Sequence, residues 1–164
     1  MTRSRIPDLG PNGEGWVAGQ VALILAVAVL GALALPHALD AGGFVRPLQI
    51  IAGAVLMVTG ALVVWIGIGD LGPSLAPTPR PRSDGQLIVR GIYARVRHPI
   101  YAGIIELAIG WAGVTGSGWA FAASLVLAIW LDLKSRREEA WLVERYPEYA
   151  AYRERTPRFR PRFR

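Results

Sequence analysis

The sequence predicts an all-α integral membrane protein, a bundle of about four transmembrane helices followed by a cytoplasmic helical tail at the C-terminus. Hydrophobic residues make up 52% of the 164-residue chain, and the mean hydropathy of +0.34 is high for a soluble domain. Charged residues are sparse in the first half of the chain and crowded near its end. Four apolar runs, separated by charged or turn-forming segments, give the predicted helices.

The first two runs reach the roughly 20 residues that a helix needs to cross the hydrocarbon core. Residues 16–35 contain Gln20 as their one polar side chain, and Pro36 is expected to end this helix. The run is longer than the apolar region of a typical signal peptide, so we interpret it as a retained anchor. Residues 48–68 form the second run, which stops near Asp70.

The third and fourth runs predict a helical hairpin. Residues 100–114 are a shorter run that contains Glu106, and residues 119–133 follow after the turn-forming sequence Thr115-Gly116-Ser117-Gly118. The fourth helix is expected to continue into an amphipathic stretch that ends at Arg145. Residues 134–164 form the predicted tail of a single membrane domain, and residues 158–164 are expected to be its basic, lipid-facing end.

Almost all basic residues fall in segments that four membrane spans would place on the same side of the membrane. The N-terminus, the loop between Asp70 and Pro99, and the tail all lie on one side of the membrane and hold 17 of the 18 Lys and Arg residues. Arg46 lies on the other side. Because basic loops are retained in the cytoplasm, both termini and the polar loop are predicted to be cytoplasmic.

Composition excludes several kinds of site. The chain has no Cys, which rules out disulfides, thiolate metal ligands and Cys nucleophiles. Its two His residues are too far apart for a metal-ligand spacing, so no metal is predicted. The pI near 10.5 is explained by basic residues that contact lipid head groups, so no nucleic acid partner is predicted. Residues 67–72 match the glycine pattern of a dinucleotide site but follow a membrane helix, so no such site is predicted.

Glycines recur every seven residues in two of the predicted helices, which places them on one face of each helix. Small residues at such a face let membrane helices approach closely. We therefore predict that these glycines pack helix against helix. They are Gly53, Gly60, Gly67, Gly103 and Gly110.

A tract of polar residues marks the entry to the third span: Gly91-Ile92-Tyr93-Ala94-Arg95-Val96-Arg97-His98-Pro99-Ile100-Tyr101-Ala102-Gly103. Pro99 suits the first position of a helix and keeps His98 out of the helical conformation. The helix N-terminus that follows favours an anionic group. Taken alone, this tract is typical of basic residues beside a membrane.

Glu138 and Glu139 form an acidic pair on the predicted fourth helix. A mixed-charge run of this kind is usually a solvated helix face. Here the pair follows shortly after the last apolar turn, at the level of Arg97 and His98. Folding the hairpin of the third and fourth spans should therefore bring the two clusters face to face.

The entry tract, the acidic pair and the sequence Tyr149-x-x-Tyr152-x-x-Arg155-x-Pro157 together resemble the isoprenylcysteine carboxyl methyltransferase family of integral membrane proteins. That family is similar in turn to the phospholipid N-methyltransferases. The resemblance spans roughly residues 81–161 and implies a transferase that moves a methyl group from S-adenosylmethionine to a lipophilic acceptor in the bilayer. The implied acceptor is a carboxylate, and a thiol or an amine remains an alternative.

The resemblance also implies a cytoplasmic active site that the tail completes. Carboxylates would face the sulfonium and ammonium of the cofactor, Arg or His its carboxylate, and aromatic rings its adenine or sulfonium. Catalytic roles fall on Arg97, which would orient the acceptor, and on Glu139, which would contact the polar end of the cofactor or of the acceptor. Glu106, an intramembrane acid outside the family pattern, is a candidate substrate residue. The implied cofactor-binding residues are Tyr93, His98, Pro99, Tyr101, Gly103, Glu138 and Glu139.

Two other functions fit the same fold. One is a membrane protein that binds lipid without catalysis. The other is an NADPH enzyme similar to sterol reductases, although those proteins are longer and have more spans. Specific, competable binding of S-adenosylmethionine distinguishes the methyltransferase from both.

Overall fold

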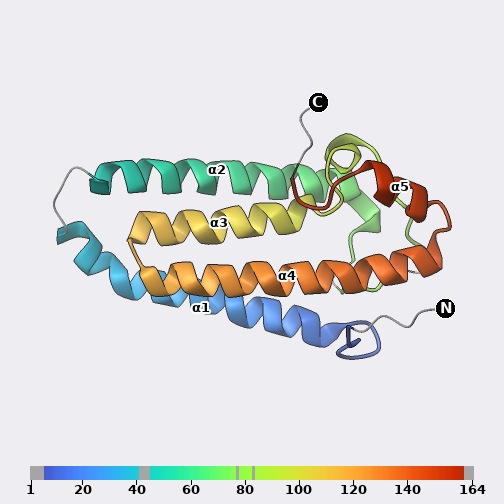
Figure 1. Ribbon diagram of the computed structural model, residues 1–164, viewed down its shortest axis with the longest axis horizontal. Coiled ribbons are helices and arrows are strands. Elements are labelled where there is room, and N and C mark those ends of the chain that lie inside the picture. The colour runs from blue at the N-terminus through green and yellow to red at the C-terminus, as the bar shows by residue number, and fades with distance from the viewer. Residues whose placement is uncertain (1–5, 41–44, 77, 83, 161–164) are drawn as a thin grey trace.

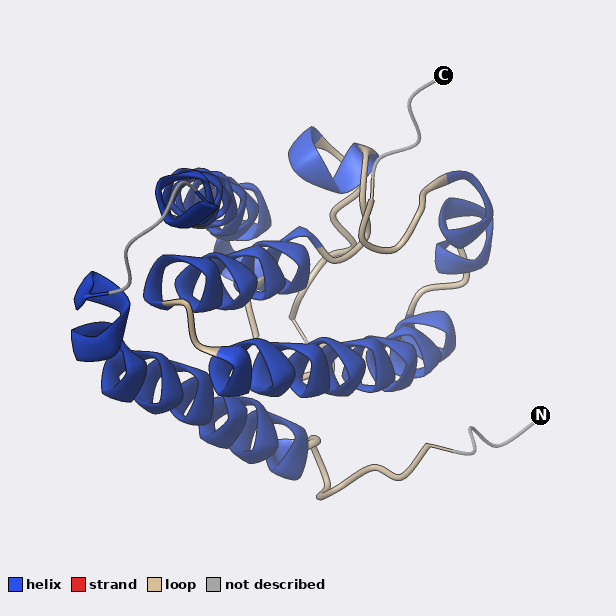
Figure 2. Ribbon diagram, turned by 60° about the vertical axis from the view of Figure 1, so that its left-hand side comes forward, coloured by secondary structure: helices blue, strands red, loops and turns tan. Residues whose placement is uncertain are grey.

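The computed structural model describes residues 6–40, 45–76, 78–82 and 84–160. Four long helices run side by side, and a short fifth helix, α5 (Tyr149–Arg155), lies at one end of the bundle (Figure 1). The described residues contain helices and loops but no strand (Figure 2), which confirms the predicted all-helical fold. The elements are α1 (Glu14–Asp40), α2 (Val45–Leu71), η1 (Gly72–Ser74), η2 (Gly91–Ala94), α3 (Pro99–Thr115), α4 (Gly118–Arg145) and α5 (Tyr149–Arg155).

Three of these helices, α1, α2 and α4, are long and apolar enough to cross a membrane, judged over the described residues. α3 has 17 residues and is about 26 Å long, somewhat less than the hydrocarbon thickness of about 30 Å. At the end of the bundle nearest α5, α3 stops well short of α2 and α4 (Figure 1). The loop before α3 and the helix α5 lie at this end of the bundle (Figure 1).

Pro36 does not end the first helix, so that prediction is wrong. α1 continues through Pro36 to Asp40. A proline inside a helix removes one backbone hydrogen bond, and membrane helices tolerate this where neighbouring groups compensate. The predicted continuation of the fourth helix to Arg145 is confirmed by α4.

The turn between α3 and α4 follows from its sequence. Gly116 ends α3 with a φ of +66°, in the left-handed region that favours glycine. Ser117 then caps α4, because its hydroxyl accepts a hydrogen bond from the backbone N–H of Ala120. The two helices consequently lie next to each other as the predicted hairpin.

α2 and α3 are in backbone contact along the predicted glycine face. A Cβ atom built on Gly60 would lie 2.6 Å from the carbonyl oxygen of Gly103, and one on Gly53 would lie 2.6 Å from that of Gly110. Real Cβ atoms do not approach so closely, so both pairs require glycine. Gly67 continues the face against the first turn of α3, and the prediction of glycine-mediated packing is confirmed.

On its other side α3 packs against α1 and α4. Two indoles fix α1 there: Trp130 donates a hydrogen bond to the carbonyl of Trp16, and Trp111 donates to that of Ala28. Leu127 and Leu131 of α4 are fully buried in the same core. α3 is thus the central helix against which the other three long helices are placed.

Candidate functional site

A cavity of about 250 Å³ lies at the end of the bundle where α3 stops short. Its wall is built from the loop around residues 74–88, η2, the first turn of α3, the second half of α4, and α5. Among the residues that line it are Gln20, Tyr93, Arg97, His98, Tyr101, Lys134, Glu138, Tyr149 and Tyr152. Five predicted site residues therefore meet at one cavity, namely Tyr93, Arg97, His98, Tyr101 and Glu138.

The segment that enters α3 is paired with the C-terminal end of the described chain. The backbone N–H of Arg97 donates to the carbonyl of Pro157, and that of His98 donates to the carbonyl of Arg158, both at 3.0 Å. His98 has φ −128° and ψ 63°, outside the helical region, as the following proline requires. The C-terminal segment thereby fixes the residues that carry the site.

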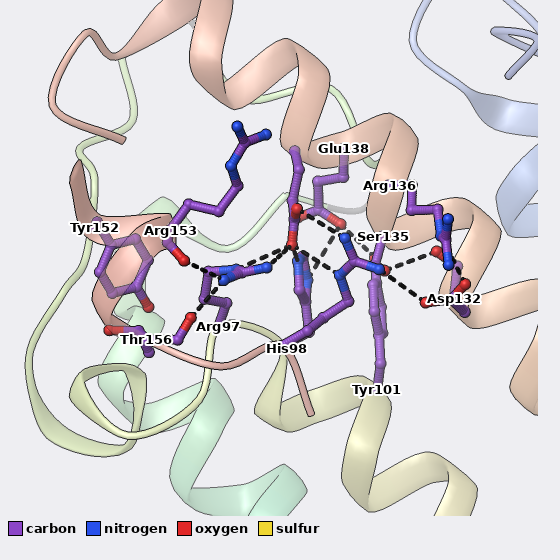
Figure 3. A network of polar contacts seen from close by, with 12 residues as sticks. Arg97, His98, Tyr101, Asp132, Ser135, Arg136, Glu138, Tyr152, Arg153 and Thr156 are labelled. Atoms are coloured by element: carbon purple, nitrogen blue, oxygen red, sulfur yellow. Dashed lines mark hydrogen bonds and ion pairs between the residues drawn. The ribbon is translucent and has the colours of Figure 1, made fainter. Parts of the chain in front are cut away.

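Glu139 is the centre of a buried ion-pair network, to which the labelled Arg97 and His98 belong (Figure 3). Its Oε1 atom lies 3.1 Å from Nε2 of His98 and 3.0 Å from Nε and from Nη2 of Arg97. Arg158 donates to both carboxylate oxygens at 3.0 Å. The Glu139 side chain is only 4% exposed. Burial alone would raise the pKa of Glu139, but the hydrogen bonds and charges of His98 and Arg158 hold that pKa well below its ordinary value.

Arg97 connects this network to α5. Its guanidinium donates through Nη1 to the carbonyl of Arg153 at 2.7 Å and to that of Thr156 (Figure 3). Since Nε and Nη2 face Glu139, four of the five guanidinium N–H groups contact protein. Arg97 is therefore largely engaged in holding α3, α4 and α5 together.

Arg158 is a site residue that the sequence interpretation missed, and its assignment to a lipid-facing basic end is wrong. Besides Glu139, its Nη1 atom contacts Oδ1 of Asp132 at 2.9 Å, and Arg136 pairs with the other oxygen of Asp132. Residues 161–164 of that basic end lie outside the described residues. The proline before Arg158, which turns the chain, was the one local signal that this arginine could point back.

Glu138 faces the cavity, in contrast to its neighbour. Its Oε2 atom accepts a hydrogen bond of 2.7 Å from the hydroxyl of Tyr101 and lies 3.9 Å from Nδ1 of His98. The Glu138 side chain is 24% exposed. The rings of His98 and Tyr101 are stacked, with their centroids 5.4 Å apart and their planes at 5°. Of the acidic pair, Glu139 thus belongs to the buried network, whereas the carboxylate of Glu138 is accessible.

Three tyrosines close the cavity from the side of α5 and η2. Tyr152 donates a hydrogen bond of 2.5 Å to the carbonyl of Tyr93, whereas the buried hydroxyl of Tyr149 has no hydrogen-bond partner among the described residues. Burial raises the pKa of Tyr152 to about 12 and the pKa values of Tyr93 and Tyr149 further. All three hydroxyls therefore stay protonated at neutral pH, and the Tyr149 hydroxyl is a free donor in the cavity wall.

Three predicted site residues lie elsewhere. Pro99 is buried as the first residue of α3, and Gly103 contacts the backbone of α2. Glu106 accepts a hydrogen bond of 3.1 Å from the hydroxyl of Thr59 in α2. None of the three is among the described residues that line the cavity. Within the described chain, no group of three or more His, Asp or Glu side chains is placed to hold a metal ion.

Comparison with known proteins shows the family of this chain. A curated relative, the cobalt-zinc-cadmium resistance protein CzcN of Cupriavidus metallidurans, is 35% identical over 105 residues, which cover 58% of this chain and 48% of the relative. The chain thus spans about half the length of this relative. Residues 48–149, more than half of the chain, match the phospholipid methyltransferase family. That family lies in the isoprenylcysteine carboxyl methyltransferase-like superfamily, as the sequence resemblance predicted. The chain belongs to the phospholipid methyltransferase family.

Proposed function

We propose that this protein is an integral membrane methyltransferase that uses S-adenosylmethionine and acts on a lipophilic acceptor. The observation that carries the proposal is the convergence of His98, Tyr101 and Glu138 on one cavity, in a chain of a methyltransferase family. Carboxyl O-methyl transfer is the reaction that we propose, and a thiol or an amine is the alternative acceptor. The cavity lies at the end of a membrane helix, where a lipophilic acceptor can reach a polar donor.

The side chains of the cavity fit S-adenosylmethionine. The Glu138 carboxylate complements a sulfonium or an ammonium group, and the tyrosine rings complement a cation or a flat base. The partnerless hydroxyl of Tyr149 gives independent support. A buried polar group without a partner costs about 1–3 kcal/mol, and a ligand in the cavity would remove that cost.

When bound, S-adenosylmethionine supplies a methyl carbon that its sulfonium activates for displacement. The protein's own contribution is to hold the acceptor in line and to exclude water. Residues 74–76, 78–82 and 85–88 line the cavity together with α5, and Leu71 and Ile100 give its wall an apolar part. A carboxylate acceptor needs no proton removed. An amine acceptor does, and Glu138 is the carboxylate in the cavity wall that is placed to accept that proton.

The decisive experiment is a methyl-transfer assay on the purified protein in detergent or nanodiscs. Labelled S-adenosylmethionine is offered with a panel of lipophilic carboxylates, thiols and amines, and S-adenosylhomocysteine is added as a competitor. We expect labelled product from one class, and inhibition by the competitor. Absence of any competable binding of S-adenosylhomocysteine would favour a lipid-binding protein without catalysis. Oxidation of NADPH with a sterol would instead favour a reductase.

Tyr149→Phe tests whether the cavity holds this ligand. The variant removes a buried hydroxyl that bonds to nothing described in the protein, so its thermal stability should equal or exceed that of the wild type. Its affinity for S-adenosylhomocysteine should fall about two- to tenfold. The matched control is Tyr152→Phe, which loses the bond to Tyr93 and should be less stable. Unchanged affinity in Tyr149→Phe would remove this hydroxyl from the site.

We further propose that both termini and the cavity are cytoplasmic. The basis is the concentration of 17 of the 18 basic residues in the segments on that side. A reporter fused after the last residue should report a cytoplasmic location. One inserted between α1 and α2 should report the opposite side, and the reverse pattern would contradict the four-span topology.

A further inference from the structure

Lys134 is a buried cation in the cavity wall, and the proposed function leaves it without a role. The residue is only 4% exposed. Its Nζ atom donates a hydrogen bond of 2.5 Å to Oε1 of Gln20 in α1 and lies 5.0 Å from the ring centroid of Tyr101. An ammonium has three donors, and its one described hydrogen bond goes to a neutral amide. Glu138 attracts the Lys134 ammonium electrostatically, but no carboxylate of the described residues forms an ion pair with it. Because a buried charge is costly unless an anion contacts it, this position suits an anionic ligand.

Glu138 follows Lys134 by one helical turn on the same face of α4. Residues four apart on a helix are neighbours, with Cβ atoms about 5–6 Å apart. Both side chains line the cavity. Tyr101 contacts both, because its hydroxyl donates to Glu138 and its ring faces Lys134. The cavity wall therefore presents one positive and one negative group side by side.

The arginines of the cavity are engaged with protein groups. Arg97 contacts Glu139 and two carbonyls of the C-terminal segment. Arg80 donates to the carbonyl of Pro11, and Arg82 pairs with Asp84. Arg80 and Arg82 are exposed. Among the described Arg and Lys residues of the wall, Lys134 is thus the buried one that has no carboxylate in ion-pair contact.

We propose that Lys134 and Glu138 bind the amino-acid end of the methyl donor, with the Lys134 ammonium on its α-carboxylate and the Glu138 carboxylate on its α-ammonium. An α-amino acid carries both charges on one carbon, so a cation and an anion one turn apart match it. Gln20 orients the Lys134 ammonium. This inference rests on the proposed function and specifies which residues recognise the donor.

Three ligands test it: S-adenosylhomocysteine, its analogue without the carboxylate, and its analogue without the amine. Each is titrated calorimetrically into the purified protein. Lys134→Met should lower the affinity for S-adenosylhomocysteine and for the analogue that keeps the carboxylate on the order of tenfold or more. Its affinity for the analogue without the carboxylate should be unchanged. Glu138→Gln should give the reciprocal pattern. It should lower the affinity for the two ligands that carry the amine and leave the affinity for the analogue without the amine unchanged. This second variant tests the subsite independently of how well Lys134→Met folds.

Two controls separate binding from folding. Arg95→Gln removes an exposed positive charge of the entry tract and should leave all three affinities unchanged. Lys134→Met replaces a buried charge by an apolar side chain of similar length, so it should unfold at an equal or higher temperature.

Other outcomes overturn the inference in distinguishable ways. If Lys134→Met lowers the affinity for all three ligands equally, or for none of them, Lys134 does not bind the carboxylate. Unchanged donor affinity with a raised KM for an acceptor would place the cation against the acceptor head group. If the wild type binds none of the three ligands, the proposed function fails as well.

Discussion

Glu139→Gln is expected to lower the stability of the protein by about 3–5 kcal/mol, the usual consequence of breaking a buried ion pair. The Glu139 carboxylate faces Arg97, His98 and Arg158 at 3.0–3.1 Å. Glutamine keeps the shape but removes the charge, which leaves Arg97 without its anionic partner and Arg158 with Asp132 alone. The measurement is thermal unfolding of the purified variant in detergent. Glu138→Gln, one residue earlier and 24% exposed, is the matched control and should unfold close to the wild type.

The same carboxylate should make stability depend on pH. The pKa of Glu139 is held below its ordinary value in the folded protein, so its contribution is complete above the unfolded-state pKa of about 4.3. That contribution is lost as the pH falls below this value towards the depressed folded-state pKa. We expect the wild type to lose stability over this acidic range and Glu139→Gln to lose less. Parallel pH profiles of the two proteins would show that Glu139 is not the charged centre of the network.

The helices could be predicted because length and charge determine them in a membrane. An apolar run must satisfy its backbone within one helix, and charges mark where it leaves the hydrocarbon. α2, α3 and α4 begin and end close to the predicted residues for this reason. Pro36 shows the limit of the local rule, since packing of α1 against the bundle outweighs one missing hydrogen bond.

The meeting of the entry tract with the acidic pair could also be predicted, because a hairpin brings its two open ends together. Which glutamate faces the cavity could not. Successive residues on a helix point about 100° apart, so the rotation of α4 decides the roles of Glu138 and Glu139. That rotation depends on packing with α1 and α3. Gly103 was predicted both to pack helix against helix, from its seven-residue spacing to Gly110, and to bind the cofactor, from the family resemblance. The structure places it against the backbone of α2.

The family resemblance implied that the tail completes the site, but the particular contacts of Tyr149 and Arg158 could not be predicted, for a different reason. Both depend on how the chain after α4 folds back on α3, a contact between segments far apart in sequence. The backbone bonds from Arg97 and His98 to the C-terminal segment fix that contact. Neither periodicity nor composition of the tail indicates it, and a basic tail after a membrane helix is ordinarily interpreted as lipid-facing.

Arg97→Lys separates two roles for this arginine and is expected to have the largest effect on turnover. Sequence reasoning assigns Arg97 to orienting the acceptor, whereas its donors are directed at Glu139, Arg153 and Thr156. Lysine keeps the charge but lacks the planar fork, so it cannot bind the carboxylate and both carbonyls together. A carbonyl left without its partner costs about 1–3 kcal/mol, and α5 is held less firmly as a result.

Because α5 carries Tyr149 and Tyr152 of the cavity wall, loosening it should reach the site. We expect Arg97→Lys to lower the unfolding temperature, the affinity for S-adenosylhomocysteine and the rate of methyl transfer together. Unfolding, calorimetry and the transfer assay on one preparation measure the three effects. The control Arg153→Gln keeps the backbone carbonyl that Arg97 binds, and should leave all three near the wild type. If transfer falls at least tenfold while stability and donor affinity hold, the fifth N–H of Arg97 acts on the acceptor itself, as the sequence first suggested.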